Sequence, residues 1–489
     1  YNTALGDTAL GTCTTGDSNT AVGKSALAAN TTGHENVAVG EQCMESITTG
    51  TRNTAVGNGA LYTNETGNYN VALGNGALQA YTASNSVALG YDCLTNCSTG
   101  ANNTGVGYKA LEATTTGANN TGIGYGALNV NTTADDNTAL GWGSLNQNTT
   151  GEDNTAVGKD TLISNTTGSY STAIGNESLA SNTTGRNTAV GHRSLRTVTT
   201  GNNNTGIGDH ALNACTGSYN TALGHAALQQ NTSGESNVAV GRLALTLNTT
   251  AASNTAIGHA SMESNTTGAY NVAVGRSALG ANTTGEQNTA FGGKALQSNT
   301  TAGYNTAIGY QAGRDNTTGT GMVAVGYAAL IKQTTGAQNT ACGYDALGEN
   351  TTGTNNTAVG YFALQENTTG NQNVAIGVEA LEDSTTAANN NAVGFRSLHA
   401  CTTGEGNQAF GGYALQTLTT GSANIGIGYN TGGSIANGNH NVCIGGEAGV
   451  NITSGSGNTT VGYTAANDIT TGAYNTCIGR GAGEGITDQ

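Results

Sequence analysis

Small, apolar and polar residues recur in a fixed order about every 17 residues along this chain. We number the positions of one repeat from the Asn of the phrase N-T-A-V-G, first complete at residues 19–23. Position 2 is usually Thr or Val, position 4 is always apolar, position 3 is nearly always Ala or Gly, and position 5 is always Gly. This alternation has a period of two and predicts a short β-strand. A helix is disfavoured because a glycine ends every copy of the phrase.

The repeat runs through the whole sequence without a segment that differs from it. Position 5 is occupied by 29 glycines, from Gly6 to Gly479, and three of the steps between them are one residue short, after Gly74, Gly175 and Gly208. A fixed period of this length indicates one structural unit stacked on copies of itself. The predicted fold is all-β, a parallel β-solenoid (β-roll) of about 29 coils, forming a single continuous repeat domain over residues 1–489.

At a strand spacing of about 4.8 Å, such a stack of coils predicts a rod on the order of 140 Å long. The sequence opens at Tyr1 without Met or a signal peptide, and it closes at residues 486–489, in both cases inside a repeat. We therefore interpret it as part of a longer protein, truncated at both ends.

The remaining positions predict a narrow core and a turn. Position 8 is small, position 9 is usually Leu, and positions 13 to 15 commonly read T-T-G, which is typical of a turn. Position 12 is commonly Asn, but Ile47, Val198 and Leu418 replace it elsewhere. Because those residues are usually buried, position 12 is predicted to face inward, with its Asn side chains hydrogen-bonded to one another as a ladder.

Positions 9 and 12 are predicted to share one volume. In the last four copies the Leu of position 9 is lost while position 12 becomes Ile, so a loss on one side is matched by a gain on the other. The four pairs are Gly432 with Ile435, Gly449 with Ile452, Ala466 with Ile469 and Gly483 with Ile486. Gly313 is an exception because its partner is still Asn316. That coil is predicted to be under-packed.

Composition and charge exclude some classes of partner. Low apolar content often indicates disorder, but here the apolar residues recur in register and each coil can bury them. The net charge of −16 argues against nucleic acid as a partner, since no basic surface is available. No run of 18 apolar residues occurs, so we expect no membrane insertion in this segment.

The repeated phrase resembles a known family of surface fibres. Asn85-Ser86-Val87-Ala88-Leu89-Gly90 is similar to the N-S-V-A-I-G phrase of trimeric autotransporter adhesin heads, which form parallel β-rolls. The longer phrase, with A-L-x-x-N-T-T-G between copies, resembles repeats in phage and marine-virus tail fibres. The resemblance implies an extracellular fibre, commonly trimeric, that holds a binding tip away from a surface. This repeat is longer than that of the adhesin heads, and no coiled-coil stalk or membrane barrel occurs within it.

Aromatic residues at position 6 are the best candidate binding surface. Stacked coils place them in rows, which can bind surface glycans or another chain, or can simply stabilise neighbouring coils. The two rows are Tyr91, Tyr108, Tyr125 and Trp142, and then Tyr310, Tyr327, Tyr344 and Tyr361.

Four acidic residues at positions 16 and 17 of two neighbouring coils form a candidate calcium site. They are Asp135, Asp136, Glu152 and Asp153. Crowded carboxylates suit Ca²⁺, although exposed acids can also remain solvated, and no G-G-x-G-x-D calcium repeat is present. No other cofactor is indicated.

The remaining motifs point to structure rather than chemistry. The nine Cys are interpreted as small core residues, and only Cys93 and Cys97 share a coil closely enough to meet. The glycosylation sequons at position 12 are predicted to be buried, which leaves Asn102 and Asn119 as better acceptors. The seven His have no repeating Ser or Cys partner, so we expect no enzyme.

We therefore predict a structural or adhesive extracellular fibre. The Ala and Gly of positions 3 and 5, from Ala4 and Gly6 through Ala358 and Gly360, form a stripe that another copy can approach closely. This predicts a homo-oligomer, a trimer by the resemblance, with a head-to-tail filament as the alternative. The competing interpretation is that these small residues face the inside of a very narrow coil. Ice binding is a further alternative, since Thr rows occur at positions 13 and 14, but those rows lie in a turn.

Overall fold

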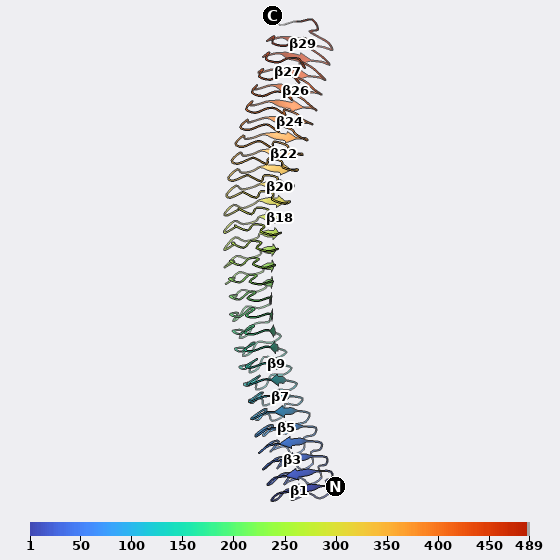
Figure 1. Cartoon of the computed structure of the whole chain (residues 1–489), viewed down its shortest axis with the longest axis vertical. Coiled ribbons are helices and arrows are strands. Elements are labelled where there is room, and N and C mark those ends of the chain that lie inside the picture. Colours follow the sequence, from blue (N-terminus) through green and yellow to red (C-terminus); the bar gives the residue numbers. More distant parts are fainter. Residues whose placement is uncertain (487–489) are drawn as a thin grey trace. The chain divides into compact units, whose positions relative to one another are not determined.

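The chain winds in short coils, each of which carries one β-strand. The structure, a computed structural model, describes residues 1–486 and forms 29 strands and no helix within them. Figure 1 shows one strand in each coil, in chain order. The predicted parallel β-solenoid with a 17-residue repeat is confirmed. The last three residues of the incomplete final repeat lie outside the described part of the chain.

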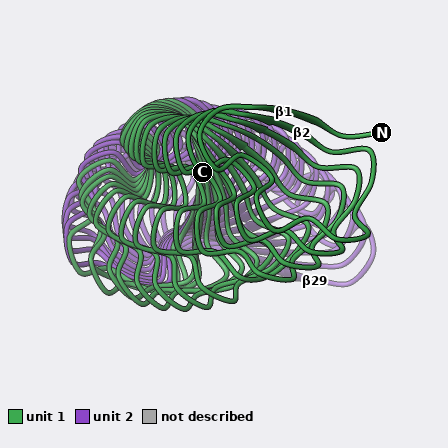
Figure 2. Cartoon of the chain, turned by 90° about the horizontal axis from the view of Figure 1, so that it is seen from below, with its two compact units in different colours: residues 1–237 green, residues 238–489 purple. Residues whose placement is uncertain are grey.

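The coils group into two compact units, residues 1–237 and residues 238–489, coloured separately in Figure 2. The strands of the first unit are β1 (Thr3–Leu5), β2 (Thr20–Val22), β3 (Val37–Val39), β4 (Thr54–Val56), β5 (Val71–Leu73), β6 (Val87–Leu89), β7 (Thr104–Val106), β8 (Thr121–Ile123), β9 (Thr138–Leu140), β10 (Thr155–Val157), β11 (Thr172–Ile174), β12 (Asn187–Val190), β13 (Asn204–Ile207) and β14 (Thr221–Leu223).

The strands of the second unit are β15 (Val238–Val240), β16 (Thr255–Ile257), β17 (Val272–Val274), β18 (Thr289–Phe291), β19 (Thr306–Ile308), β20 (Val323–Val325), β21 (Thr340–Cys342), β22 (Thr357–Val359), β23 (Val374–Ile376), β24 (Asn391–Val393), β25 (Gln408–Phe410), β26 (Ile425–Ile427), β27 (Val442–Ile444), β28 (Thr459–Val461) and β29 (Thr476–Ile478).

Within each unit, consecutive strands pair in parallel and in register. Between β10 and β11, for example, Thr155 lies opposite Thr172 and Ala156 opposite Ala173. Parallel strands need a crossover of a dozen or more residues, and the rest of the 17-residue coil provides it. Because neighbours along a column are one coil apart, every side chain stacks on its counterpart from the adjacent coil.

Glycine at position 5 is required by both conformation and packing. Its φ lies between +121° and +147° in every copy, a region that L side chains rarely adopt. A Cβ at Gly343 would also lie 2.2 Å from the carbonyl oxygen of Gly360 in the next coil. Position 15 restricts the residue type less. A Cβ at Gly336 would meet the next coil at 2.4 Å, but the φ of this glycine is not left-handed. Ala134 occupies the same position in another coil.

The core is narrow and lies on one side of each strand. Position 3 is buried together with positions 8, 9 and 12, as in the coil of Ala55, Ala60, Leu61 and Asn64. The Leu of position 9 adopts a left-handed φ, near +55° at Leu111. That conformation costs roughly 1–2 kcal/mol. Burying a Leu side chain contributes about 1.5–3 kcal/mol, so the buried Leu offsets the strain of its own turn.

Buried Asn side chains form the predicted ladder at position 12. Asn148 Nδ2 donates to Asn131 Oδ1 of the preceding coil at 3.0 Å and to the carbonyl oxygen of Gly151 in its own coil at 2.9 Å. All three of the Asn131, Asn148 and Asn165 side chains are fully buried. Position 12 therefore faces inward as predicted, and its sequons are enclosed in the core.

A second Asn ladder, which the sequence analysis did not predict, runs along position 1. The backbone N–H of Asn36 donates to Asn19 Oδ1 at 3.0 Å, and Asn36 Nδ2 donates to the carbonyl oxygen of Gly50 at 2.8 Å. Each of these Asn residues thus bonds to the Asn before it through its backbone and to the carbonyl oxygen of position 15 through its side chain. The ladder satisfies polar groups that would otherwise be buried without partners.

The shared volume of positions 9 and 12 is confirmed where Ile replaces Asn. A Cβ at Gly432 would lie 2.9 Å from Ile435 Cδ1, and a Cβ at Gly449 would lie 3.0 Å from Ile452 Cδ1. The Ile side chain therefore occupies the space that a position 9 side chain would fill. Ile486 is the exception, since it is 42% exposed in the last described coil.

The prediction that the coil of Gly313 is under-packed is wrong. A Cβ at Gly313 would lie only 2.4 Å from the Cε of Met322, a buried residue that replaces the Asn of position 1 in the adjacent coil. The flexible Met side chain fills the gap, and its sulfur accepts a hydrogen bond from Gln333 Nε2 at 3.3 Å. The space at position 9 is therefore filled from position 1 of the adjacent coil, whereas the sequence analysis considered only position 12 of the same coil.

The two glycine positions predict different responses to the same substitution. Gly343→Ala at position 5 should destabilise the fold by about 2–5 kcal/mol, because it adds a steric clash to a disfavoured φ. Gly336→Ala at position 15 should cost less, about 1–2 kcal/mol, because a Cβ there also meets the backbone of the next coil but the φ is one that Ala adopts in other coils. Urea unfolding of both variants tests this, and equal destabilisation would contradict the role given to φ.

Leu111 and Thr114 test the shared core volume. Leu111→Gly should cost about 2–4 kcal/mol through loss of a buried side chain. Adding Thr114→Ile should recover about 1–2 kcal/mol, because it fills the space and removes a buried hydroxyl that has no hydrogen-bond partner. A double variant no more stable than Leu111→Gly in thermal unfolding would show that the two positions do not share a volume.

Candidate functional site

The outward side of the strands forms a regular surface on each unit. We call it the strand face, and it consists of the side chains at positions 2 and 4. Large apolar residues remain exposed there, including Ile257 and Phe291 in the second unit and Leu140 in the first. Their counterparts stack at one strand spacing, so apolar side chains form continuous columns.

The predicted interface stripe at positions 3 and 5 is wrong. Ala55, Ala72 and Ala358 are fully buried in their own chain, so no second copy can contact them. A Cβ added at Gly105 of position 3 would meet Cys93 Sγ and Leu94 Cδ1 of the preceding coil, which shows that this position faces the core. The competing interpretation, a very narrow coil with small residues inside, is confirmed for position 3, whereas glycines of position 5 such as Gly57 and Gly360 are half-buried.

A column of threonines occupies position 2 of the strand face in the first unit. It is unbroken from β7 to β14, and the residues are Thr104, Thr121, Thr138, Thr155, Thr172, Thr188, Thr205 and Thr221. Their hydroxyl groups make no hydrogen bond within the described residues, whereas the position 13 hydroxyls bond to the next coil, as Thr149 Oγ1 does to the carbonyl oxygen of Thr166 at 2.9 Å. Among the described residues, free threonine hydroxyls therefore occur on the strands and also at position 14 of the turn, where Thr150 Oγ1 makes no hydrogen bond, whereas the position 13 hydroxyls are bonded.

The aromatic residues of position 6 stack on one another. In the row from Tyr91 to Trp142, neighbouring ring centroids are 5.1 to 5.9 Å apart and the rings are within 13° of parallel. In the row from Tyr310 to Tyr361 the separations are 5.0 to 5.7 Å. Inside each row the ring faces meet each other, and a ligand approaching from solvent meets mainly ring edges and hydroxyl groups.

A polar groove lies where the repeat loses a residue after Gly175. Arg186 occupies position 16 there, and position 17 is absent. The same position is filled by Tyr170 in the preceding coil and by Asn203 in the following one. The resulting cavity has a volume of about 520 Å³, and Tyr170, Arg186, Asn202 and Tyr219 are among its lining residues. Tyr170 and Tyr219 are 56% and 62% exposed, and the guanidinium carbon of Arg186 lies 4.6 Å from the Tyr170 ring centroid.

This groove combines the groups that hold polar ligands. Aromatic rings offer apolar faces, amides and hydroxyls offer hydrogen bonds, and Arg186 offers a planar cation for a carboxylate or sulfate. The sequence analysis recorded the short step but assigned no site to it. The signal was the gap itself, because omitting one residue from a column of stacked side chains leaves a space between its neighbours.

The four acids of the candidate calcium site are not gathered around a common point. Asp135 Oδ1 accepts a hydrogen bond from the backbone N–H of Ala118 at 2.7 Å, and it thereby serves the turn. Within residues 1–486, two groups of three side chains bring metal-ligand atoms within 4.8 Å of one another, and neither includes Asp135, Asp136, Glu152 or Asp153.

Those two groups are His192 with Asp209 and His210, and Glu379 with Glu382 and His399. The sequence analysis considered the His residues only as catalytic candidates and assigned no metal site to them. Their positions contained the signal, since His192, Asp209 and His225 occupy position 6 of three successive coils.

All nine Cys are free thiols, and seven of them are buried. Cys93 and Cys97 do not form a disulfide. Burial raises the pKa of both thiols to about 12, so neither is reactive near neutral pH. The prediction that Cys fills small core positions is confirmed for these buried residues, whereas Cys342 is exposed on the strand face.

Neither a protein-family model nor a curated protein matches this sequence. No helix in the described part of the chain has the length and apolar character needed to cross a bilayer.

The aromatic rows predict a stability difference between exposed Tyr residues that stack and those that do not. Tyr327→Ala should destabilise the fold by about 1–2 kcal/mol, because Tyr327 stacks on both Tyr310 and Tyr344. Tyr304→Ala is the matched control, since Tyr304 has no aromatic partner among the described residues and should change stability by less than about 0.5 kcal/mol. Equal effects in thermal unfolding would show that stacking does not stabilise the row.

Proposed function

We propose that this chain is a structural segment of an extracellular fibre or shaft that presents a surface for attachment. The observation that carries the proposal is the strand face, on which apolar side chains that are exposed or half-exposed recur in register coil after coil. A surface of this kind favours a matching partner, because isolated proteins rarely expose continuous apolar columns. The resemblance to adhesin heads and tail fibres supports a place on a cell or virion surface.

The partner we propose is another copy of the same chain, with a trimer as the expected assembly. Because position 3 faces the core, we place the proposed interface at positions 2 and 4 instead of positions 3 and 5. Columns of Val, Ile and Thr from identical repeats share the same spacing, so they can pack along their whole length. Head-to-tail stacking of coil ends is the filament alternative.

A variant pair tests the assembly. Val325→Lys with Val359→Lys places two charges beside Cys342 on the strand face, and these should dissociate the oligomer because buried unpaired charges are costly. The control, Gln338→Lys with Asn355→Lys, adds the same charge at exposed residues of the turn and should leave the assembly intact. Light scattering reports the mass of the particle.

The native thiol of Cys342 gives a second readout. It should react slowly with iodoacetamide in the assembled protein and rapidly in the strand-face variant. A folded, monodisperse monomer for the unmutated chain would contradict self-association through this face.

Ice binding is the second candidate function, and the threonine column of β7 to β14 is the observation that favours it. These hydroxyls lie on a regular strand surface at one strand spacing, beside the apolar column of position 4. A monomer with thermal hysteresis that Thr155→Lys abolishes would support ice binding over assembly. An oligomer without hysteresis would exclude it.

The groove beside Arg186 is the attachment surface that we propose for glycans, with acidic sugars preferred because of the guanidinium. Arg186→Ala should lower binding to acidic glycans on an array by about tenfold, the value of one charge-assisted hydrogen bond. Arg52→Ala is the matched control, since Arg52 also lies over a Tyr ring, that of Tyr69, but lines no groove that we describe. Equal loss in both variants would contradict a role for the groove.

A further inference from the structure

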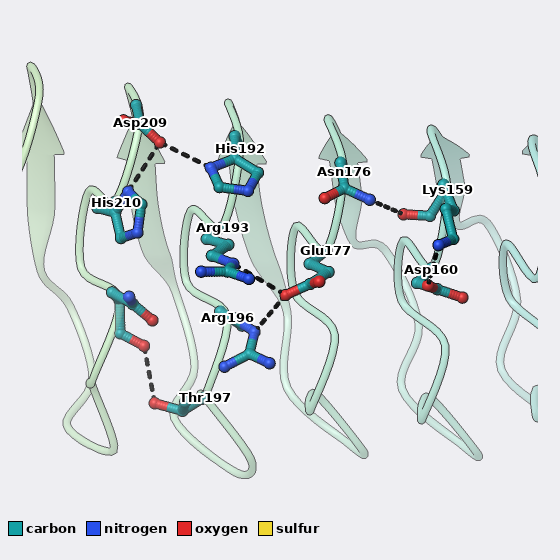
Figure 3. Close-up of polar contacts among 11 residues, drawn as sticks. Lys159, Asp160, Asn176, Glu177, His192, Arg193, Arg196, Thr197, Asp209 and His210 are labelled. Carbon is teal, nitrogen blue, oxygen red and sulfur yellow. Dashed lines mark hydrogen bonds and ion pairs between the residues drawn. The ribbon is translucent and has the colours of Figure 1, made fainter.

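Three His and one Asp meet on three successive coils of the first unit. His192, Asp209 and His225 each follow the glycine that comes directly after a strand, β12, β13 and β14 respectively, and His210 follows Asp209. The solenoid brings these residues together because position 6 of each coil stacks on position 6 of the next. Figure 3 shows His192, Asp209 and His210 side by side at the ends of their strands.

Asp209 is the centre of this group. The Nδ1–H groups of His192 and His210 donate to the same oxygen, Asp209 Oδ1, at 2.9 and 2.8 Å. The Nε2 atom of His225 lies 3.7 Å from the other oxygen, Oδ2. The hydrogen bond from His192 holds the pKa of the Asp209 carboxyl below its ordinary value, so the group is ionised at neutral pH.

We propose that His192, Asp209 and His210 bind one Zn²⁺ ion, with His225 beside the remaining coordination position. Two imidazoles and a carboxylate are among the ligand sets that zinc prefers, and three protein ligands leave room for a water molecule or a fourth His. The three ligand atoms already lie within 4.8 Å of one another. Only rotation of the side chains and a change of imidazole tautomer are needed to turn the nitrogen lone pairs toward a metal ion.

Neighbouring charges favour this group over the second one. In the group of Glu379, Glu382 and His399, the guanidinium of Arg396 already bonds to Glu379 and supplies the positive charge that a metal ion would bring. Beside Asp209 the nearby guanidinium groups are engaged elsewhere. Arg193 and Arg196 both bind Glu177 of the preceding coil, at 3.0 and 2.6 Å, as Figure 3 also shows.

The position of the site gives it a structural consequence. The coil steps after Gly175 and Gly208 are each one residue short, and the site lies between them. A metal ion bound by His192, Asp209 and His210 would join the coils of β12 and β13 where the repeat is irregular. Because binding to the folded state stabilises it, zinc should raise the melting temperature of this unit.

The metal-free chain, prepared by dialysis against a chelator, tests the proposal in calorimetric titration with ZnCl₂. We expect one site per chain, and His192→Ala with His210→Ala should weaken binding by about 100-fold or more, since loss of even an outer-shell partner costs about 10–100-fold. His34→Ala with His259→Ala is the matched control and should change nothing. Asp209→Asn keeps the shape of the side chain but removes its charge, and it should also weaken binding.

Cobalt distinguishes this site from the thiols. Co²⁺ bound by imidazole and carboxylate gives weak visible bands, whereas thiolate ligands add an intense near-ultraviolet band, so Cys342→Ser is included as a control because Cys342 is the exposed thiol. Weak bands that disappear in the His192→Ala, His210→Ala variant would support the proposal. Unchanged zinc binding in that variant, binding lost in Cys342→Ser, or no binding by the unmutated chain would each overturn it.

Discussion

The close contact between backbones at position 5 is the constraint on which the other features of the coil depend. A Cβ on such a glycine would meet the carbonyl group of the glycine one coil further on, as at Gly343, and the φ is one that side chains rarely adopt. This contact ends the strand, turns the chain and sets the distance between coils. Every column of side chains takes its spacing from it, including the Asn ladders, the aromatic rows and the strand face.

A polar core is the second consequence of this geometry. Coils this narrow enclose little apolar volume, and the apolar content of the chain is correspondingly low. The core is completed by amide ladders, in which each Asn bonds to the coil before or after its own. Because the ladders bond along the stack, cohesion between coils depends on repetition, and a single coil would leave its amides without partners.

Two candidate ligand sites lie at or beside short steps of the repeat. The polar groove beside Arg186 exists because one residue is missing from a column. The His and Asp cluster lies on the ordinary position 6 column, but between two short steps. Regular stretches of the repeat produce uniform surfaces suited to self-association, whereas irregular coils produce local surfaces able to recognise a distinct ligand.

The sequence by itself determined the fold class, the length of the coil and the inward direction of position 12. These follow from periodicity and from which residue types replace Asn, because burial restricts the substitutions that a position accepts. The direction of the strand remained open, since an alternation of small and branched residues is compatible with either face turned inward. Tertiary structure decided that the small residues of position 3 face the core, where they pack against the Leu of the turn.

The atomic contacts between coils could also not be predicted from the sequence. Met322 fills the space at Gly313 from the adjacent coil, and the amides of position 1 bond across coils, although nothing in a single repeat indicates either contact. The meeting of His192, Asp209 and His210 depends on rotamers and on the stacking of columns. A repeat specifies which residues share a column, but only the three-dimensional packing decides which of their atoms meet.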